Sequence, residues 1–223
     1  MARYIQRHSK MKRWIHGIHM VATVVLLFTG AVVFVPAIGR AFGPQVVDVL
    51  RIFHRVFAVT FIGVPIIGAI VAPSGAKHLW KNTFEKWDDD DREFMKKFVP
   101  YMLAPKKVHM PKQHEVKSGQ RLADGGLVLF AILIALSGAV LWAGAYVSVG
   151  VFAVAKLVHD ISFLMIAILG IAHLYLGAGI FQPYRGMGRV MFGDGLISEA
   201  DARYHWGHWA EEELKSGEKV VEA

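Results

Sequence analysis

The chain has 223 residues, of which 54% are hydrophobic and 19% are charged, and it contains no cysteine. This composition is unusual for a soluble domain and typical of a membrane protein. The absence of cysteine excludes disulfides, thiolate-bound iron–sulfur clusters, covalently attached haem and a cysteine nucleophile. A metal would therefore need histidine or carboxylate ligands. The formal net charge of +7 does not indicate nucleic-acid binding, because the basic residues flank apolar runs.

Four apolar runs approach or exceed the length of a membrane-spanning helix, which is about 20 residues. They cover residues 15–38, 53–72, 123–146 and 151–181. Only helices fit these runs, since lipid offers the backbone no hydrogen-bond partners. The sequence therefore predicts an all-α membrane protein, a four-transmembrane-helix bundle that forms a single integral-membrane domain over residues 1–223. Residues 73–121 would form a large loop and residues 182–223 a tail.

Lysine and arginine are distributed unevenly between the connecting segments. The N-terminal segment and residues 73–121 are rich in both, whereas the first connection holds only Arg40 and Arg51 and the last holds none. The positive-inside rule then predicts that both termini, the 73–121 loop and the tail are cytoplasmic. An even number of spans agrees with this orientation.

The last apolar run carries two histidines, His159 and His173. They are fourteen residues apart, close to four helical turns, so both imidazoles lie on nearly the same face and about 20 Å apart along the axis. Histidine within a membrane helix is rare and usually functional. One histidine near each leaflet suggests two metal centres stacked across the membrane. Iron porphyrin is the natural candidate, because haem iron takes axial histidine ligands.

The first two runs supply partners for these histidines. His54 begins the second run at the outer side, at the depth of His159, and His16 begins the first run at the inner side, at the depth of His173. Depth therefore predicts an outer pair, His54 with His159, and an inner pair, His16 with His173. Each pair would clamp one haem iron.

Two features near these positions leave alternatives open. His19 lies one turn after His16 and can face the same way, so either residue can be the inner ligand; a solvated interfacial side chain is the alternative for each alone. Gly30 and Gly68 follow His16 and His54 by fourteen residues. They would let a porphyrin edge approach the backbone, although ordinary packing of small residues explains either glycine alone.

The segment from Arg203 to Glu211 resembles an amphipathic helix at the membrane interface. Its tryptophans, Trp206 and Trp209, suit the headgroup region. His205 and His208 are spaced to share a metal, but two ligands without a third are weak support for a metal site.

With these residues in view, the chain resembles the cytochrome b (gamma) subunit of membrane-bound respiratory formate dehydrogenase. That subunit is one of a broader group of dihaem cytochromes b that also serve hydrogenases and thiosulfate reductases. The resemblance covers nearly the whole chain. It rests on Arg13 and His16 with Gly30, His54, His159 with His173, Gly119-Gln120, and Trp206-Gly207-His208-Trp209. Lys117 stands where the family has an asparagine, and Gly17 where it has a tryptophan.

The resemblance implies a multi-pass protein of the bacterial inner membrane with two haem b groups held by the same histidine pairs. It implies a quinone on the cytoplasmic side, near Gly119, Gln120 and His173. The chain would then be a subunit that does not oxidise substrate by itself. Its partners would be an iron–sulfur subunit and a catalytic dehydrogenase on the outer face, with formate as the expected substrate, membrane lipid around the spans, and a higher oligomer of the complex as an option.

Other functions compete with this interpretation. A cytochrome b subunit of a hydrogenase or of a thiosulfate or polysulfide reductase would use the same haems with a different partner. A haem-free transporter would use the buried histidines as a proton relay and would show no Soret absorption. A purely structural anchor would tolerate loss of all four histidines.

Overall fold

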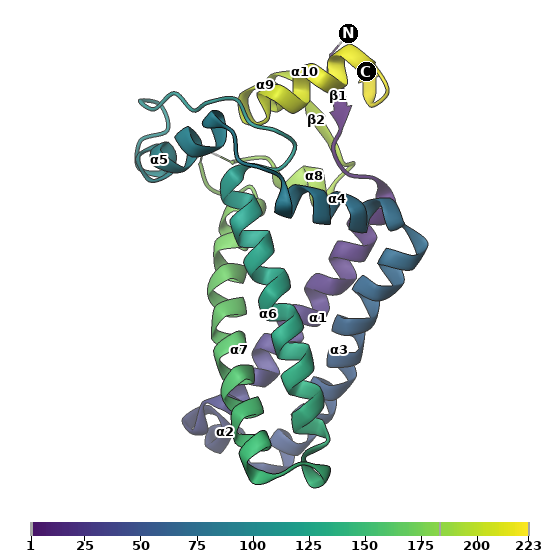
Figure 1. Ribbon diagram of the computed structural model, residues 1–223, viewed down its shortest axis with the longest axis vertical. Coiled ribbons are helices and arrows are strands. Elements are labelled where there is room, and N and C mark those ends of the chain that lie inside the picture. The colour runs from purple at the N-terminus through teal and green to yellow at the C-terminus, as the bar shows by residue number, and fades with distance from the viewer. Residues whose placement is uncertain (1, 183, 223) are drawn as a thin grey trace. The chain divides into compact units, whose positions relative to one another are not determined.

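The structure is a computed structural model that describes residues 2–182 and 184–222. Its helices include four that are long and apolar enough to cross a membrane, drawn in Figure 1. They are α1 (Lys10–Phe34), α3 (Pro44–Val71), α6 (Ser118–Trp142) and α7 (Val149–Gly177). The predicted all-α membrane fold with four spans is confirmed, whereas the side of the membrane on which the termini lie stays a prediction.

The first connection between spans is more helical than the sequence suggested. Helix α1 ends before Val35, which is extended, and Pro36 opens the short helix α2 (Pro36–Phe42). Gly43, with a φ of 79°, then turns the chain into α3 at Pro44. Proline is well suited to the first position of a helix because it has no N–H to satisfy there. Helix α3, which contains the predicted second span, therefore begins at Pro44, before residue 53.

The chain divides into two compact units, which are described separately. The terminal unit comprises Met1–Arg13, Lys77–Gly125 and Ile171–Ala223, and the span unit comprises Trp14–Ala76 and Gly126–Gly170. Three of the long helices, α1, α6 and α7, continue from one unit into the other. A single domain over the whole chain stays a prediction.

The span unit is held together by close helix contacts at glycines. A Cβ on Gly126 would lie 3.0 Å from Leu169, and one on Gly68 would lie 3.4 Å from Ile15. The short 3₁₀ helix η1 (Gly144–Tyr146) turns the chain from α6 to α7. Large apolar side chains remain exposed, as in Ile70, which is 74% exposed, and this is expected for helices that face lipid.

The terminal unit contains a small antiparallel sheet that the sequence did not predict. Its strands are β1 (Arg3–Gln6), β2 (Leu196–Ser198) and β3 (Val220–Glu222), in the order β2-β1-β3. The central residue Ile5 pairs with Ile197 on one side and Val220 on the other. Strands of three or four residues are too short for an alternating pattern to reveal.

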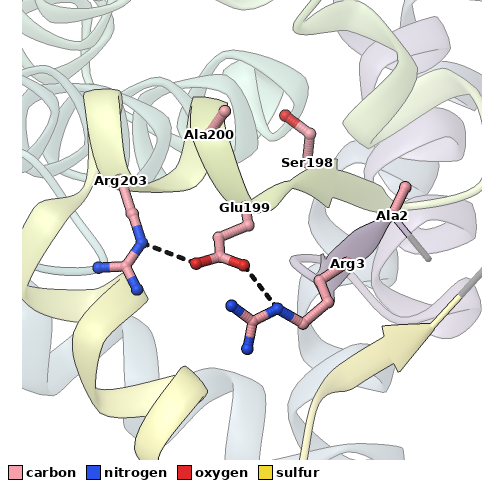
Figure 2. Close-up of a pocket in the computed structure, with 6 residues that line it drawn as sticks. All are labelled: Ala2, Arg3, Ser198, Glu199, Ala200 and Arg203. Atoms are coloured by element: carbon pink, nitrogen blue, oxygen red, sulfur yellow. Dashed lines mark hydrogen bonds and ion pairs between the residues drawn. The ribbon is translucent and has the colours of Figure 1, made fainter.

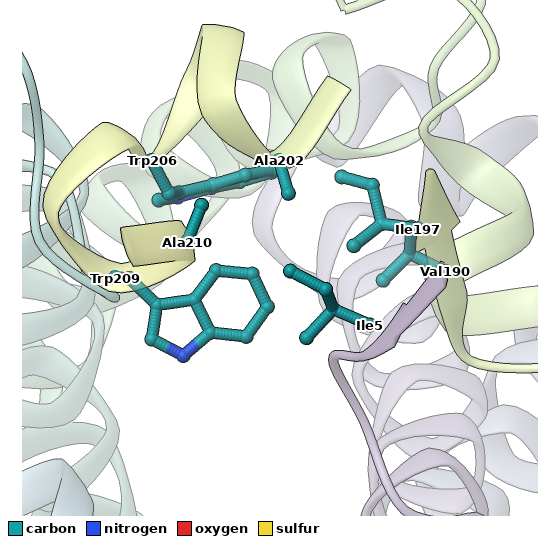
Figure 3. Packing of buried hydrophobic residues seen from close by; sticks show 7 residues of the cluster. All are labelled: Ile5, Val190, Ile197, Ala202, Trp206, Trp209 and Ala210. Atoms are coloured by element: carbon teal, nitrogen blue, oxygen red, sulfur yellow. The ribbon is translucent and has the colours of Figure 1, made fainter. Parts of the chain in front are cut away.

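A hydrophobic core packs against this sheet (Figure 3). Ile5 and Ile197 meet the tryptophans of the helices α9 (Glu199–His205) and α10 (Gly207–Ser216). Trp206 is only 9% exposed and Trp209 only 3%. The expectation of one interfacial helix with its tryptophans among headgroups is therefore wrong. The sheet offers these rings an apolar surface, which the sequence pattern alone did not reveal. The core is completed by Val190 of α8 (Gly188–Phe192), Ala202 and Ala210.

The loop between the second and third spans is also mostly helical, with α4 (Pro73–Phe84) and α5 (Asp89–Leu103). Asp88 caps α5 in a reciprocal capping box with Asp91, as expected for a run of acids at a helix start. Asp91, however, is not solvated. It is 1% exposed and lies 3.1 Å from Arg121 at the start of α6. The pair joins the loop to the third span.

Candidate functional site

The span unit brings the two predicted outer histidines together. His54 on α3 and His159 on α7 are half-buried, and their ring centroids lie 6.4 Å apart. A metal–imidazole bond is about 2 Å long, so two rings that hold one metal from opposite sides have centroids roughly 6 Å apart. The observed separation would therefore allow His54 and His159 to hold one haem iron between them.

The hydroxyl group of Thr29 bonds one ring nitrogen of His54, Nδ1. The hydroxyl of Thr29 donates its only hydrogen to the carbonyl of Val25 at 2.8 Å, and it lies 2.8 Å from Nδ1 of His54. With that hydrogen on Val25, the threonine oxygen accepts from Nδ1 in the tautomer of His54 that carries its proton there. The Nε2 atom of His54 is then the one with a lone pair, which is the form that binds a metal.

His159 is held in the same way. Its Nδ1 lies 3.1 Å from the carbonyl oxygen of Ile134 and 3.2 Å from the hydroxyl of Ser137. A carbonyl only accepts hydrogen bonds, and Ser137 donates its own hydrogen to Leu133 at 2.7 Å, so Nδ1 of His159 is the donor. Both histidines thus leave Nε2 with a lone pair and bond Nδ1 to the protein, which is the arrangement that metal-ligating histidines generally have.

Glycines next to these hydroxyl residues give the imidazoles room. A Cβ on Gly138 would lie 3.2 Å from Cε1 of His159, and one on Gly30 would lie 3.6 Å from Cε1 of His54 and 3.3 Å from Phe163. Gly30 was expected to leave room for a porphyrin edge, and it lies directly against the outer histidine. Thr29-Gly30 and Ser137-Gly138 thus repeat one arrangement, in which a hydroxyl residue bonds the histidine and the next residue, a glycine, leaves room for the ring. The repeat is visible in the sequence but was not predicted from it.

The predicted inner pair is divided between the two units. His16 belongs to the span unit and His173 to the terminal unit, so their pairing stays a prediction. His19, the alternative to His16, stacks on Phe61 of α3 with a centroid distance of 4.6 Å. Its ring therefore has an aromatic partner in the span unit.

The residues expected near a quinone all lie in the terminal unit. Gln120 donates a hydrogen bond to Asp124 at 3.2 Å, and Asp124 lies in electrostatic range of His173. Gly119 faces α5, where a Cβ would lie 3.4 Å from Phe94. The structure thus adds Asp124 to this set. Its spacing of i+4 from Gln120 is the signal that could have identified it.

Lys117, one turn before Gln120, is buried among aromatic side chains. Its ammonium nitrogen lies 3.2 Å from the hydroxyl of Tyr184 and 3.2 Å from Nδ1 of His205. Burial, followed by the nearby charge of Arg7, holds the pKa of Lys117 well below its usual range. Burial, with the adjacent Lys117, also lowers the pKa of His205 to about 3. His205 is therefore a neutral acceptor at physiological pH.

The tail histidines do not form the metal pair that their spacing allowed. His208 bonds Asp90 at 2.7 Å instead, away from the Lys117 contact of His205. Within residues 2–182 and 184–222, no cluster of three or more His, Cys, Asp or Glu side chains can hold a metal ion. Haem needs no such cluster, because the porphyrin supplies four ligands and the protein only the axial ones.

A shallow pocket lies on the surface of the terminal unit (Figure 2). At its centre Glu199 accepts from Arg3 at 2.8 Å and from Arg203 at 2.9 Å. The hydrogen bond from Arg203 is the main cause that lowers the pKa of Glu199. The two arginines neutralise this carboxylate, so the pocket is an exposed ion-pair cluster and has no histidine that could hold a haem. It is lined by Ala2, Arg3, Ser198, Glu199, Ala200 and Arg203.

Comparison with known families agrees with the membrane-spanning fold. The family described as prokaryotic cytochrome b561 matches residues 7–191, and the chain belongs to this family. It is accordingly a membrane protein that contains haem b and transfers electrons across the membrane. No individual curated protein matches the chain. The family match supports a cytochrome b and does not single out a formate dehydrogenase subunit.

Proposed function

We propose that the chain is a dihaem electron-transfer subunit that passes electrons from a dehydrogenase on the outer face to membrane quinone on the cytoplasmic side. The observation that carries this proposal is the outer pair. His54 and His159 lie with ring centroids 6.4 Å apart, and both have Nδ1 bonded to the protein so that Nε2 remains for iron. Bound haem would supply the one-electron redox chemistry.

His16 and His173 would hold the second haem, with His19 as the alternative to His16. The spacing of His159 and His173 on α7 supports two centres at different depths. Two histidines on each iron would leave no open position, which would suit electron transfer and not oxygen chemistry. The half-buried Asp124 near His173 would orient that ligand, as carboxylates do for metal-bound histidine.

Gly119, Gln120 and His173 would form the quinone site. The support for it is the resemblance given above and the hydrogen bond that holds Gln120 on Asp124. The quinone would take its protons from the cytoplasm, so that charge is separated across the membrane. The uneven distribution of lysine and arginine supports an inner-membrane protein with both termini cytoplasmic.

The partners would be an iron–sulfur subunit and a catalytic dehydrogenase, with formate as the expected substrate. The hydrogenase and the thiosulfate or polysulfide reductase alternatives share every feature of the haem site. Co-purification of the chain with its partner, followed by assay with formate, hydrogen and thiosulfate, separates them.

The decisive experiment is a reduced-minus-oxidised spectrum with a pyridine haemochrome count on the purified chain. We expect two b haems in the wild type and one in each of the His54→Ala, His159→Ala, His16→Ala and His173→Ala variants. His19→Ala should keep both. A wild-type chain without haem would refute the cytochrome function and favour the proton relay. Loss in His19→Ala but not in His16→Ala would move the inner ligand by one turn.

A further inference from the structure

One face of α4 combines two aromatic and two basic side chains. Lys77, Trp80, Lys81 and Phe84 are spaced i, i+3, i+4 and i+7, so they share one side of the helix. Trp80 is 70% exposed and Phe84 is 66% exposed. Their rings pack together with centroids 4.5 Å apart, and both lysines are exposed. This set of four residues is called the α4 face below.

The α4 face is exposed, whereas a neighbouring side of the helix packs against another helix. A Cβ on Gly125, at the start of α6, would lie 3.4 Å from Cγ2 of Thr83, so Thr83 is on the side of α4 that packs on α6. Helix α4 contains no acidic residue. In the part of the chain that the structure describes, neither Lys77 nor Lys81 forms an ion pair, so two positive charges lie beside two exposed rings.

The position of α4 along the chain keeps this face near the membrane. Helix α3 ends at Val71 and α4 begins at Pro73, which leaves only Ala72 between a span and α4. At a rise of 1.5 Å per residue, Trp80 lies about 10 Å along the helix from Pro73, and Pro73 is only two residues from the end of that span. The headgroup layer begins where the span ends, so the α4 face can reach it.

The chemistry of the face matches that layer. Tryptophan is enriched at membrane–water interfaces, and lysine extends its apolar stem along lipid while its charge reaches the phosphates. Basic residues near the surface favour anionic lipids. We propose that α4 is an interfacial anchor whose exposed face binds anionic phospholipid of the same membrane. Trp80 and Phe84 enter the acyl boundary, and Lys77 and Lys81 bind the phosphates.

The absence of cysteine makes the depth of α4 directly measurable. Single cysteines at positions 80, 84 and 81 can carry a nitroxide, and the chain can be placed in nanodiscs that contain phosphatidylglycerol. We expect labels at 80 and 84 to be accessible to oxygen, like a reference label at Ile70, which is 74% exposed on a span. The label at 81 should lie at headgroup depth. The proposal would be overturned if labels at 80 and 84 were as accessible to aqueous nickel reagent as a label at Lys215.

A charge test distinguishes anionic lipid from lipid in general. The Lys77→Gln/Lys81→Gln variant should bind phosphatidylglycerol about fivefold more weakly for each lysine lost, measured as a dissociation constant by native mass spectrometry. Binding of phosphatidylcholine should not change. The matched control is Lys106→Gln/Lys107→Gln, which removes two exposed lysines of the same loop outside α4. An equal effect in both variants, or none in the first, would contradict the proposal. Neither test depends on haem or quinone.

Discussion

Oγ1 of Thr29 and Nδ1 of His54 lie 2.8 Å apart and join α1 to α3. With the threonine hydrogen given to the carbonyl of Val25, Nδ1 of the imidazole is the donor. Ser137 repeats the arrangement for His159, with its own hydrogen given to Leu133. Helices α1 and α6 therefore set which ring nitrogen of His54 and of His159 keeps its lone pair.

Removing the Thr29 hydroxyl tests this directly. Thr29→Val keeps the shape of the side chain but leaves Nδ1 of His54 without its acceptor. We expect affinity for haem at the outer site to fall by about 10–100-fold, since such outer partners contribute that much to metal affinity. Haem titration followed by the Soret band measures it. Thr23→Val on the same helix is the control, because Thr23 bonds only the carbonyl of His19; an equal loss in that variant would contradict the role of Thr29.

Gly138 gives a steric test of the same site. Its missing side chain leaves His159 only 3.2 Å from where a Cβ would stand. Gly138→Val should displace the imidazole and remove one of two haems from the pyridine haemochrome count. Gly63→Val is the matched control within α3, since nothing lies within 4 Å of a Cβ there. If Gly138→Val retained both haems, the valine side chain would fit without displacing the imidazole of His159, and the predicted steric clash would be wrong.

Much of the membrane fold could be predicted because lipid leaves a spanning chain few options. The length of the apolar runs located the four spans. The predicted depths of His54 and His159 indicated that these two residues would lie close together. The sheet around Ile5 could not be predicted, because its strands are three or four residues long and far apart in sequence. Trp206 and Trp209 were misassigned for the same reason. An amphipathic helix that faces lipid and one that faces a small core have the same pattern, and only the tertiary partner distinguishes them.

Because His205 is buried, we expect the terminal unit to lose stability at acidic pH. Burial and the neighbouring Lys117 lower its pKa to about 3 in the folded state, below its usual 6.5. The folded state therefore binds fewer protons than the unfolded state between these values. Its contribution to stability is complete above about pH 6.5 and is lost as the pH falls towards 3. Unfolding followed by tryptophan fluorescence should show this loss.

His205→Gln keeps an acceptor for Lys117 but does not titrate in this range. The variant should have a flatter dependence of unfolding free energy on pH between 6.5 and 3 than the wild type. His109→Gln, which changes an exposed histidine, should follow the wild-type curve. Identical curves for all three proteins would mean that His205 is not the group whose protonation destabilises the fold.

Two aspartate–arginine pairs of equal length offer a last comparison. Asp91 and Arg121 lie 3.1 Å apart with side chains 1% and 2% exposed, whereas Asp89 and Arg92 lie 3.1 Å apart with side chains 99% and 63% exposed. Asp91→Ala leaves the Arg121 guanidinium buried without its nearest carboxylate, which costs about 3–5 kcal/mol in such pairs. Asp89→Ala breaks an exposed pair worth at most about 1 kcal/mol. We therefore expect a large drop in the unfolding temperature of the detergent-solubilised chain for Asp91→Ala and almost none for Asp89→Ala. Comparable shifts in both variants would mean that burial of the Asp91–Arg121 pair does not secure the start of α6.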